Sequence, residues 1–182
     1  MIVSHSELVE LFYQSDRLDQ RQLNWLRVRG VATQALIEPD PVLTARVAFD
    51  RAGTFDIVTN EEEGARALLF LCYDTSGVAA DITAWNPRTD RLALWLGAVV
   101  GPGEDEILRP RLGAPLPVYR DPLWWLRNDR RGIVVVDARK ARGKLAGIAM
   151  QAEDAVHAAE LRCMLTTPSP RITWQAKAGA AA

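Results

Sequence analysis

The first forty residues carry apolar side chains at the spacing of amphipathic helices. Ser4 or Ser6 can cap a first helix, because a serine side chain accepts a hydrogen bond from the first helical turn. The apolar face of this helix consists of Leu8, Val9, Leu11 and Phe12. Similar spacing predicts a second helix over residues 19–28, and a short helical turn over residues 33–37 precedes two prolines. Residues 1–40 are therefore predicted to form an N-terminal helical segment.

The middle of the chain has the short apolar runs and turn sequences of β-strands. Residues 45–49 and 54–58 flank the turn sequence Asp-Arg-Ala-Gly, which predicts a hairpin. Residues 67–73 form an apolar run typical of a buried strand, and residues 78–85 return from it after a second turn. Residues 92–96 follow as a further strand. Because consecutive strands joined by tight turns pair in the antiparallel sense, this region is predicted to be a β-meander.

The last third of the chain alternates helix and strand signals. Asp121, followed by proline, has the N-cap and first-turn chemistry of a helix that contains Leu-Trp-Trp-Leu and ends at Gly132. Residues 133–136 are β-branched and predict a buried strand. A final helix is predicted over about residues 149–165, and an edge strand over residues 171–174.

Together these elements predict an α+β fold, with a central antiparallel β-meander, N-terminal helices and a C-terminal helix-strand-helix segment. The predicted organisation is a helical segment 1–40, an α+β core 41–176 and a frayed tail 177–182, which form one domain overall. A winged-helix-like N-terminus is an alternative, because residues 23–32 contain a helix, a glycine turn and the start of another helix. That second helix would be short and would offer only Gln34 to a base, so two packed helices covering a sheet edge are the preferred interpretation.

The composition is that of an ordinary globular protein. Of the 182 residues, 48% are hydrophobic and 25% are charged, and no apolar stretch approaches the roughly 18 residues that a membrane helix requires. The N-terminus lacks a basic segment followed by an apolar run, so we expect a cytoplasmic protein without membrane contact. Cys72 and Cys163 lie in apolar stretches far apart, which is typical of buried thiols rather than a disulfide or metal site. We expect no cofactor.

Positive charge and aromatic side chains are concentrated in one part of the chain. The formal net charge is −1, but residues 109–144 carry ten Arg or Lys and three Asp, a net charge of +7, and the remainder carries −8. Within this region, residues 119–131 combine arginines with aromatic side chains, which can neutralise phosphates and stack on bases. The candidate binding residues are Arg120, Trp124, Trp125, Arg127, Arg130 and Arg131. Both nucleic acid and a protein partner suit this chemistry.

The same basic segment also has an interpretation that needs no partner. On a helix, Trp124 and Trp125 point about 100° apart, so at least one of them is expected to pack against the sheet. The arginines can pair with the acidic remainder of the same molecule. Both interpretations are compatible with the sequence.

Three residues of the chain could form part of a catalytic site. Asp137 follows four apolar residues and could join Asp81 and Lys140 in a metal-dependent nuclease or phosphoryl-transfer site. In such a site an acid and a lysine lie two residues apart on one strand face, but Arg139 occupies that position here. A strand-ending aspartate that caps the next turn is the simpler interpretation of Asp137. The sequence contains neither a Walker-type phosphate loop nor a G-x-S-x-G elbow, and neither histidine has a nucleophile nearby in sequence, so we expect a non-catalytic protein.

Four segments resemble a group of uncharacterised alphaproteobacterial proteins from prophage-like or mobile-element regions. The segments are Ala80–Arg88 (ADITAWNPR), Leu94–Gly97 (LWLG), Leu116–Arg127 (LPVYRDPLWWLR) and Ala152–Arg162 (AEDAVHAAELR). The resemblance extends over most of the chain, from about Leu23 to Ile172, and implies no activity and no catalytic residues. It implies a context in which proteins contact DNA or a DNA-handling partner. The leading hypothesis is a non-catalytic accessory or adaptor protein that binds through the basic segment.

Overall fold

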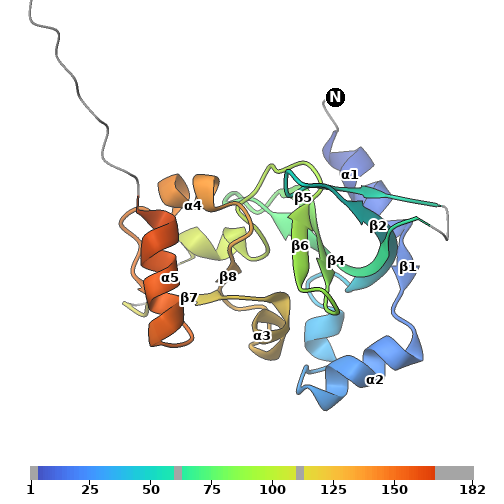
Figure 1. Cartoon of the computed structure of the whole chain (residues 1–182), viewed down its shortest axis with the longest axis horizontal. Helices are drawn as coiled ribbons and strands as arrows, with labels where there is room; N and C mark the ends of the chain where they lie inside the picture. The colour runs from blue at the N-terminus through green and yellow to red at the C-terminus, as the bar shows by residue number, and fades with distance from the viewer. Residues whose placement is uncertain (1–3, 60–62, 110–112, 167–182) are drawn as a thin grey trace, which may run out of the picture.

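The computed structural model describes residues 4–59, 63–109 and 113–166. Within them, the strands form a six-stranded, antiparallel sheet and a separate three-stranded, parallel sheet, with helices packed around both (Figure 1). The molecule therefore has the predicted α+β fold. No helix in the described ranges is long and apolar enough to cross a membrane.

The N-terminal helices begin at capping residues that the sequence marks clearly. Helix α1 spans His5–Tyr13, and Ser4 and Glu7 form a reciprocal capping box at its start. Helix α2 spans Gln20–Val28, and Asp19 pairs with Gln22 in the same way. Both predicted helices are thus confirmed. The elements around them are the two-residue strand β1 (Asp16–Arg17), which was not predicted, and the 3₁₀ helix η1 (Gln34–Leu36).

The large sheet is the predicted meander. Its other strands are β2 (Leu43–Phe49), β3 (Phe55–Ile57), β4 (Ala65–Tyr73), β5 (Ala79–Asn86) and β6 (Arg91–Leu94). They follow the order β1-β2-β4-β5-β6, and β3 pairs with the outer edge of β2. The sheet curls so far that the tip of the β2–β3 hairpin reaches β6, where the Leu94 amide donates to the Gly53 carbonyl at 3.2 Å.

Both faces of the curled sheet are covered by helices. Leu8 and Phe12 of α1 pack into an apolar core on one face, with Val47 and Leu69 among their neighbours. On the other face, α2 and helix α3 (Pro122–Arg127) contribute to a second core together with strands β4 and β5. The N-terminal helices therefore share their cores with the sheet.

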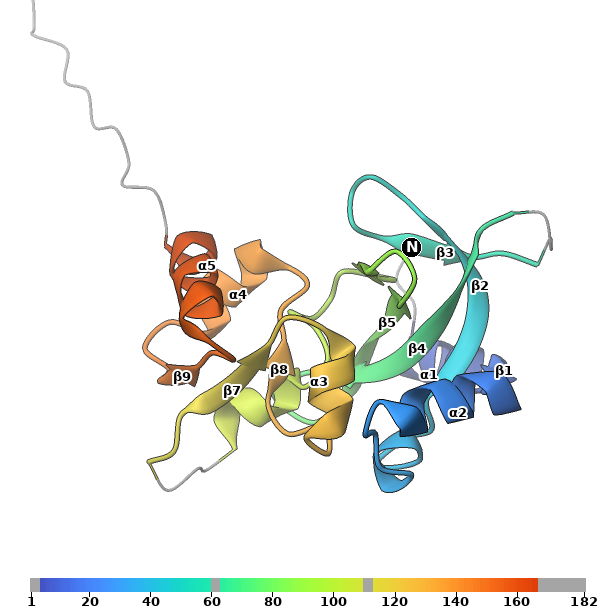
Figure 2. The same cartoon turned by 60° about the horizontal axis from the view of Figure 1, so that its bottom comes forward.

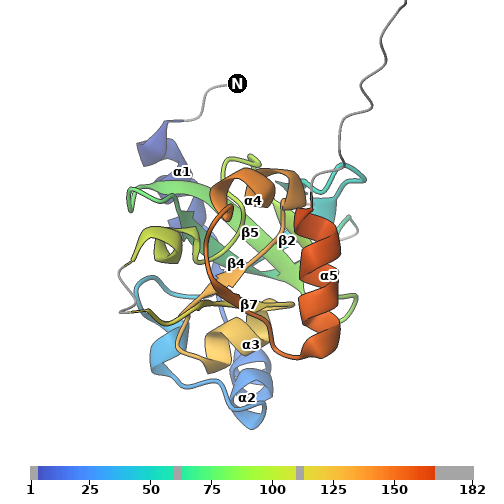
Figure 3. The same ribbon diagram turned by 90° about the vertical axis from the view of Figure 1, so that its left-hand side faces the viewer.

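The C-terminal part is built around the small sheet, with α4 and α5 side by side on its outer side (Figure 3). Its remaining elements are the 3₁₀ helix η2 (Glu104–Leu108), β7 (Leu116–Tyr119), β8 (Ile133–Val134), α4 (Ala138–Lys144), β9 (Met150–Gln151) and α5 (Ala155–Leu165). The strand order is β8-β7-β9, and both pairings are parallel. A small parallel sheet thus supplements the predicted helix-strand-helix segment.

Two predictions for this part differ from the structure. The helix predicted to end at Gly132 ends at Arg127, because the next residues include Asp129 and Arg130 in the left-handed conformation. The final helix was predicted from residue 149, but it starts at Ala155 behind the N-cap Asp154, since Met150 and Gln151 pair with β7 instead. The predicted edge strand 171–174 and the tail 177–182 lie outside the described residues.

The winged-helix alternative does not match the structure. The element after Gly30 is the three-residue η1, too short to serve as a recognition helix, and its Ala35 and Leu36 are buried. The preferred interpretation, helices packed against the sheet, describes this region better.

Candidate functional site

The structure divides the predicted binding residues into three groups. Arg120 forms the first, because it is surrounded by acidic side chains of the C-terminal part. Its guanidinium lies 2.8 Å from Asp154, 3.0 Å from Glu160 and 3.4 Å from Glu153. Hydrogen bonds from this arginine hold the pKa of Asp154 well below its usual range. Arg120 therefore fits the interpretation in which the basic segment pairs with the molecule's own carboxylates.

Trp125 and Arg130 form the second group, and both are buried. The Trp125 ring packs edge-on against Phe70 at 5.7 Å, and its Nε1 donates to the Gly132 carbonyl at 3.1 Å. This confirms that one of the two adjacent tryptophans packs against the sheet. The Arg130 Nε donates to the Ala35 carbonyl at 2.7 Å, and burial lowers the pKa of Arg130 to about 10. These two side chains join α3 to the rest of the fold and are not available to a partner.

Trp124, Arg127 and Arg131 form the third group, and all three are exposed. Asp121 caps α3 by accepting hydrogen bonds from two backbone amides, which fixes the direction in which Trp124 points. The Arg127 guanidinium lies 4.0 Å from the centre of the Trp124 ring, a cation–π contact at the surface. These three of the six predicted binding residues are therefore accessible to a partner.

A second tryptophan–arginine stack lies on α2, next to the first. Arg29 lies 4.0 Å above the Trp25 ring, and Trp25 in turn packs 6.3 Å from Trp85. A Cβ placed on Gly30 would lie 3.5 Å from Nε of Arg127, so the end of α2 meets the side chain of the first stack. Figure 2 shows α2 and α3 side by side. We call the pairs Trp25/Arg29 and Trp124/Arg127 the double stack.

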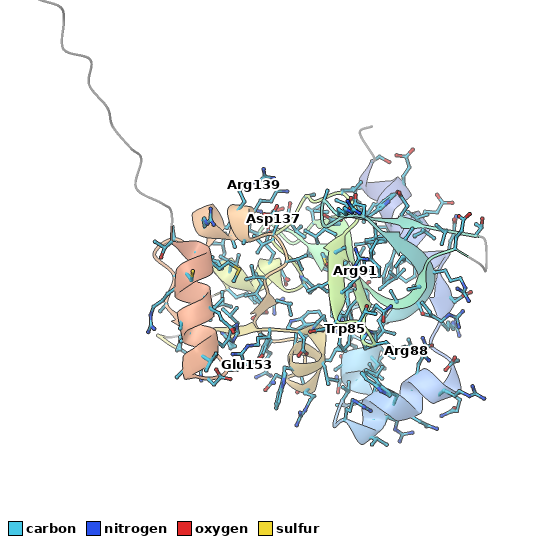
Figure 4. All side chains as sticks on the ribbon, in the orientation of Figure 1. Trp85, Arg88, Arg91, Asp137, Arg139 and Glu153 are labelled. Carbon is cyan, nitrogen blue, oxygen red and sulfur yellow. The ribbon has the colours of Figure 1, made fainter. Side chains whose placement is uncertain are left out.

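A cleft of about 620 Å³ lies beside the double stack, between α2 and the large sheet. Its described lining includes Arg21, Arg46, Arg66, Arg88, Trp25 and Asp19. We call it the arginine cleft. Figure 4 shows Trp85 and Arg88 at the end of the sheet that is next to α2. The arginine cleft belongs to the part of the chain whose overall charge is acidic.

Most of the other charges of the basic region have partners within the molecule. Arg109 pairs with Asp105 at 3.2 Å and also contacts Glu106, and Arg142 donates to the Met164 carbonyl at 2.8 Å. Lys144 contacts Glu104, a carboxylate with no exposed surface. Within the described part of residues 109–144, carboxylates therefore pair with Arg109, Arg120 and Lys144, whereas Arg127, Arg131 and Arg139 are exposed.

The two carboxylates of the nuclease hypothesis have structural roles. Asp81 is completely buried and accepts hydrogen bonds from the backbone amides of Ile82, Leu96 and Ala98. Asp137 caps α4 by accepting from two backbone amides, as its simpler interpretation predicts. Figure 4 places Asp137 and Arg139 far from Arg88. Across the described residues, no group of three or more His, Cys, Asp or Glu is placed to hold a metal ion.

The histidines and cysteines also lie in structural positions. His157 is buried, and its Nδ1 accepts from the Glu153 amide, while His5 contacts the Ala79 carbonyl. Cys72 is buried as predicted. The prediction for Cys163 was wrong: it is exposed, because α5 turns other residues such as Leu161 towards the core.

The chain matches no family model, curated protein or solved structure. The exposed tryptophan–arginine contacts of α2 and α3 are therefore the basis for assigning a function. Of the six predicted binding residues, Trp124, Arg127 and Arg131 are exposed, and the sequence did not mark Trp25 and Arg29 as their neighbours. Their spacing of four residues on a predicted helix was the available signal, because it places both side chains on one face.

Proposed function

We propose that this protein is a non-catalytic binding protein for single-stranded nucleic acid and that the double stack is its contact surface. The observation that carries the proposal is the pair of tryptophan–arginine contacts, each 4.0 Å, on adjacent helices. Unpaired bases stack on aromatic rings and on guanidinium planes, and both kinds of plane are present here. Arg131 adds a further exposed positive charge.

A single strand fits this surface better than a duplex. Bases within a duplex are stacked on one another and cannot lie on a tryptophan, whereas the bases of a single strand can. The element that follows Gly30, η1, is also too short to serve as the recognition helix of a helix-turn-helix. In keeping with the resemblance described above, we propose that the protein acts in the cytoplasm and serves a mobile element.

The experiment measures binding of a fluorescently labelled oligothymidylate to the full chain by anisotropy, with a duplex of equal length as the comparison. Replacing Trp124 with alanine together with Arg127→Gln should weaken binding about tenfold to hundredfold, because each stacked base contributes about 1–3 kcal/mol. Binding to the wild type should also weaken as salt increases.

The matched control is Arg139→Gln, which removes an exposed arginine from α4 on another part of the molecule. Its affinity for the oligonucleotide should stay close to that of the wild type. A wild-type chain that does not bind the oligonucleotide at low salt contradicts the proposal and favours a protein partner. Equal affinities of the double variant and the control would also contradict it.

A further inference from the structure

Two arginines lie directly opposite each other in the large sheet. In the antiparallel pairing of β2 and β4, Arg46 is the register partner of Arg66. Directly opposed side chains have Cβ atoms about 4.5–5.5 Å apart, and like charges in this position repel each other. Both side chains line the arginine cleft. The sheet therefore presents a like-charged pair at the floor of a cleft.

Further positive charge reaches the same cleft from two other elements. Arg21 comes from α2, and Arg88 comes from the turn between β5 and β6. In the residues that the structure describes, the guanidinium groups of Arg21, Arg46 and Arg88 have no hydrogen bond or ion pair. Only Arg66 is engaged, at 3.2 Å from Asp16 and 4.0 Å from Asp19. Four arginines thus line the cleft, and among the described residues only one of them has a carboxylate partner.

The carboxylates that engage Arg66 lie at the rim and do not fill the cleft. The side chains of Asp16 and Asp19 are 69% and 49% exposed. An exposed ion pair contributes little to stability, so an anion with stronger charge can replace these carboxylates at Arg66. The guanidinium fork fits the oxygens of a phosphate group, with two parallel hydrogen bonds.

The remaining walls of the cleft suit the organic part of a ligand. Trp25 supplies an aromatic ring and Pro87 supplies apolar surface, and both are half-buried. A volume of about 620 Å³ lies within the range of small-molecule sites. The helix that carries this wall is held to the sheet by Gln22, whose Nε2 donates to Thr44 at 3.2 Å.

We infer that the arginine cleft binds phosphate esters of nucleotides, with the phosphate between Arg46, Arg66 and Arg88 and the base against Trp25. The phosphate can come from a free nucleotide or from the backbone of a bound strand. The cleft shares Trp25 with the double stack but adds arginines that the double stack lacks, and the inference goes beyond the proposed function.

The first test is calorimetric titration of the full chain with pyrophosphate, adenosine monophosphate and adenosine. We expect the monophosphate to bind at least tenfold more tightly than adenosine. Arg46→Gln and Arg88→Gln should each weaken pyrophosphate and monophosphate binding about tenfold, because each removes a charge-assisted hydrogen bond. Arg139→Gln is again the matched control. Equal binding of adenosine and the monophosphate, or equal binding by Arg46→Gln and the control, would overturn the inference.

A second measurement separates a binding defect from a folding defect. Without phosphate, Arg46→Gln should unfold at a temperature equal to or above that of the wild type, because the opposed charges no longer repel. Pyrophosphate should raise the unfolding temperature of the wild type and of Arg139→Gln, and raise that of Arg46→Gln clearly less. An equal pyrophosphate-induced rise in Arg46→Gln and the wild type would contradict the inference.

The oligonucleotide distinguishes the two sources of phosphate and the two proposals. Displacement of the bound monophosphate by oligothymidylate would show that a strand reaches the Trp25 that the two sites share, whereas simultaneous binding would assign the cleft to a free nucleotide and remove Trp25 from the contact with the strand. If Arg46→Gln leaves both ligands bound as in the wild type, the cleft inference fails and the double stack is unaffected. If the monophosphate binds but the oligonucleotide does not, the proposed function fails and the cleft inference holds.

Discussion

Replacing Gly132 with alanine tests how the small sheet is fixed to α3. Gly132 has φ of +93°, and a Cβ at this position would lie 2.4 Å from the carbonyl oxygen of Pro117. This oxygen belongs to β7 and cannot rotate away as a side chain does. The next residue, Ile133, pairs with Val118 of β7, so relief of the clash requires one of the two strands to move. Gly132 therefore occupies a position where only glycine fits.

The loss of stability can be worked out from these contacts. The left-handed backbone costs an alanine about 1 kcal/mol. Moving β8 away from β7 weakens the hydrogen bond from Trp125 to the Gly132 carbonyl, about 1 kcal/mol, and disturbs close packing, about 1–3 kcal/mol. We expect Gly132→Ala to lower the free energy of unfolding by about 4 kcal/mol. Urea unfolding followed by tryptophan fluorescence measures this difference.

Gly77→Ala is the matched control, because it separates the backbone cost from the clash. Gly77 has φ of +79°, and nothing lies within 4 Å of a Cβ placed there. Its replacement should cost about 1 kcal/mol, the backbone contribution alone. If the two variants lose equal stability, the close approach of Gly132 to Pro117 has no energetic effect and the reasoning is refuted.

Two further predictions concern charges that the structure pairs internally. Lys144→Met leaves the buried carboxylate of Glu104 without its cation and should lower the free energy of unfolding in urea by about 3 kcal/mol. Adding Glu104→Gln should restore part of this stability. A loss below about 1 kcal/mol in the single variant would contradict the prediction. Arg120→Gln should lower the thermal midpoint at neutral pH. Because Arg120 lowers the pKa of Asp154 in the folded state, this stabilisation is present above the ordinary value of 3.8 and is lost as the pH falls below it. The gap between the midpoints of wild type and variant should therefore narrow in acid, and a gap independent of pH would argue against the pairing.

The elements that could be predicted from sequence carry their signals locally. Ser4, Asp19 and Asp121 mark helix starts because each caps its own first turn, and the meander is visible because its strands are joined by short turns. Strands β1, β7 and β9 were missed because they are two to four residues long and are formed by pairing with distant partners. Helix α4 was missed because Ala141 is its only buried residue, which leaves no apolar stripe to detect.

In the candidate site too, features with local causes could be predicted and features that depend on distant residues could not. The packing of at least one tryptophan of α3 against the sheet could be predicted, because a helix separates adjacent residues by about 100°. The burial of Arg130 could not, because its partner Ala35 is 95 positions away. The opposition of Arg46 and Arg66 depends on the register of β2 and β4, two strands that are separated in the chain by β3. Because this register joins residues that are distant in the chain, the arginine cleft could not be predicted from the sequence.

The way the cores divide along the chain also has a consequence for biosynthesis. The core around α1 uses residues between Leu8 and Ala93, so the curled sheet can acquire half of its packing while the rest of the chain is still being translated. The core on its opposite face, which includes Phe70 and Trp85, is complete only after Trp125 and Leu126 have been synthesised. During that interval the nascent chain exposes an aromatic surface, and the arrival of α3 ends the period in which it can aggregate. Trp125 thus acts early in folding, since the strands and helices of residues 133–165 are still to be added when it reaches the sheet.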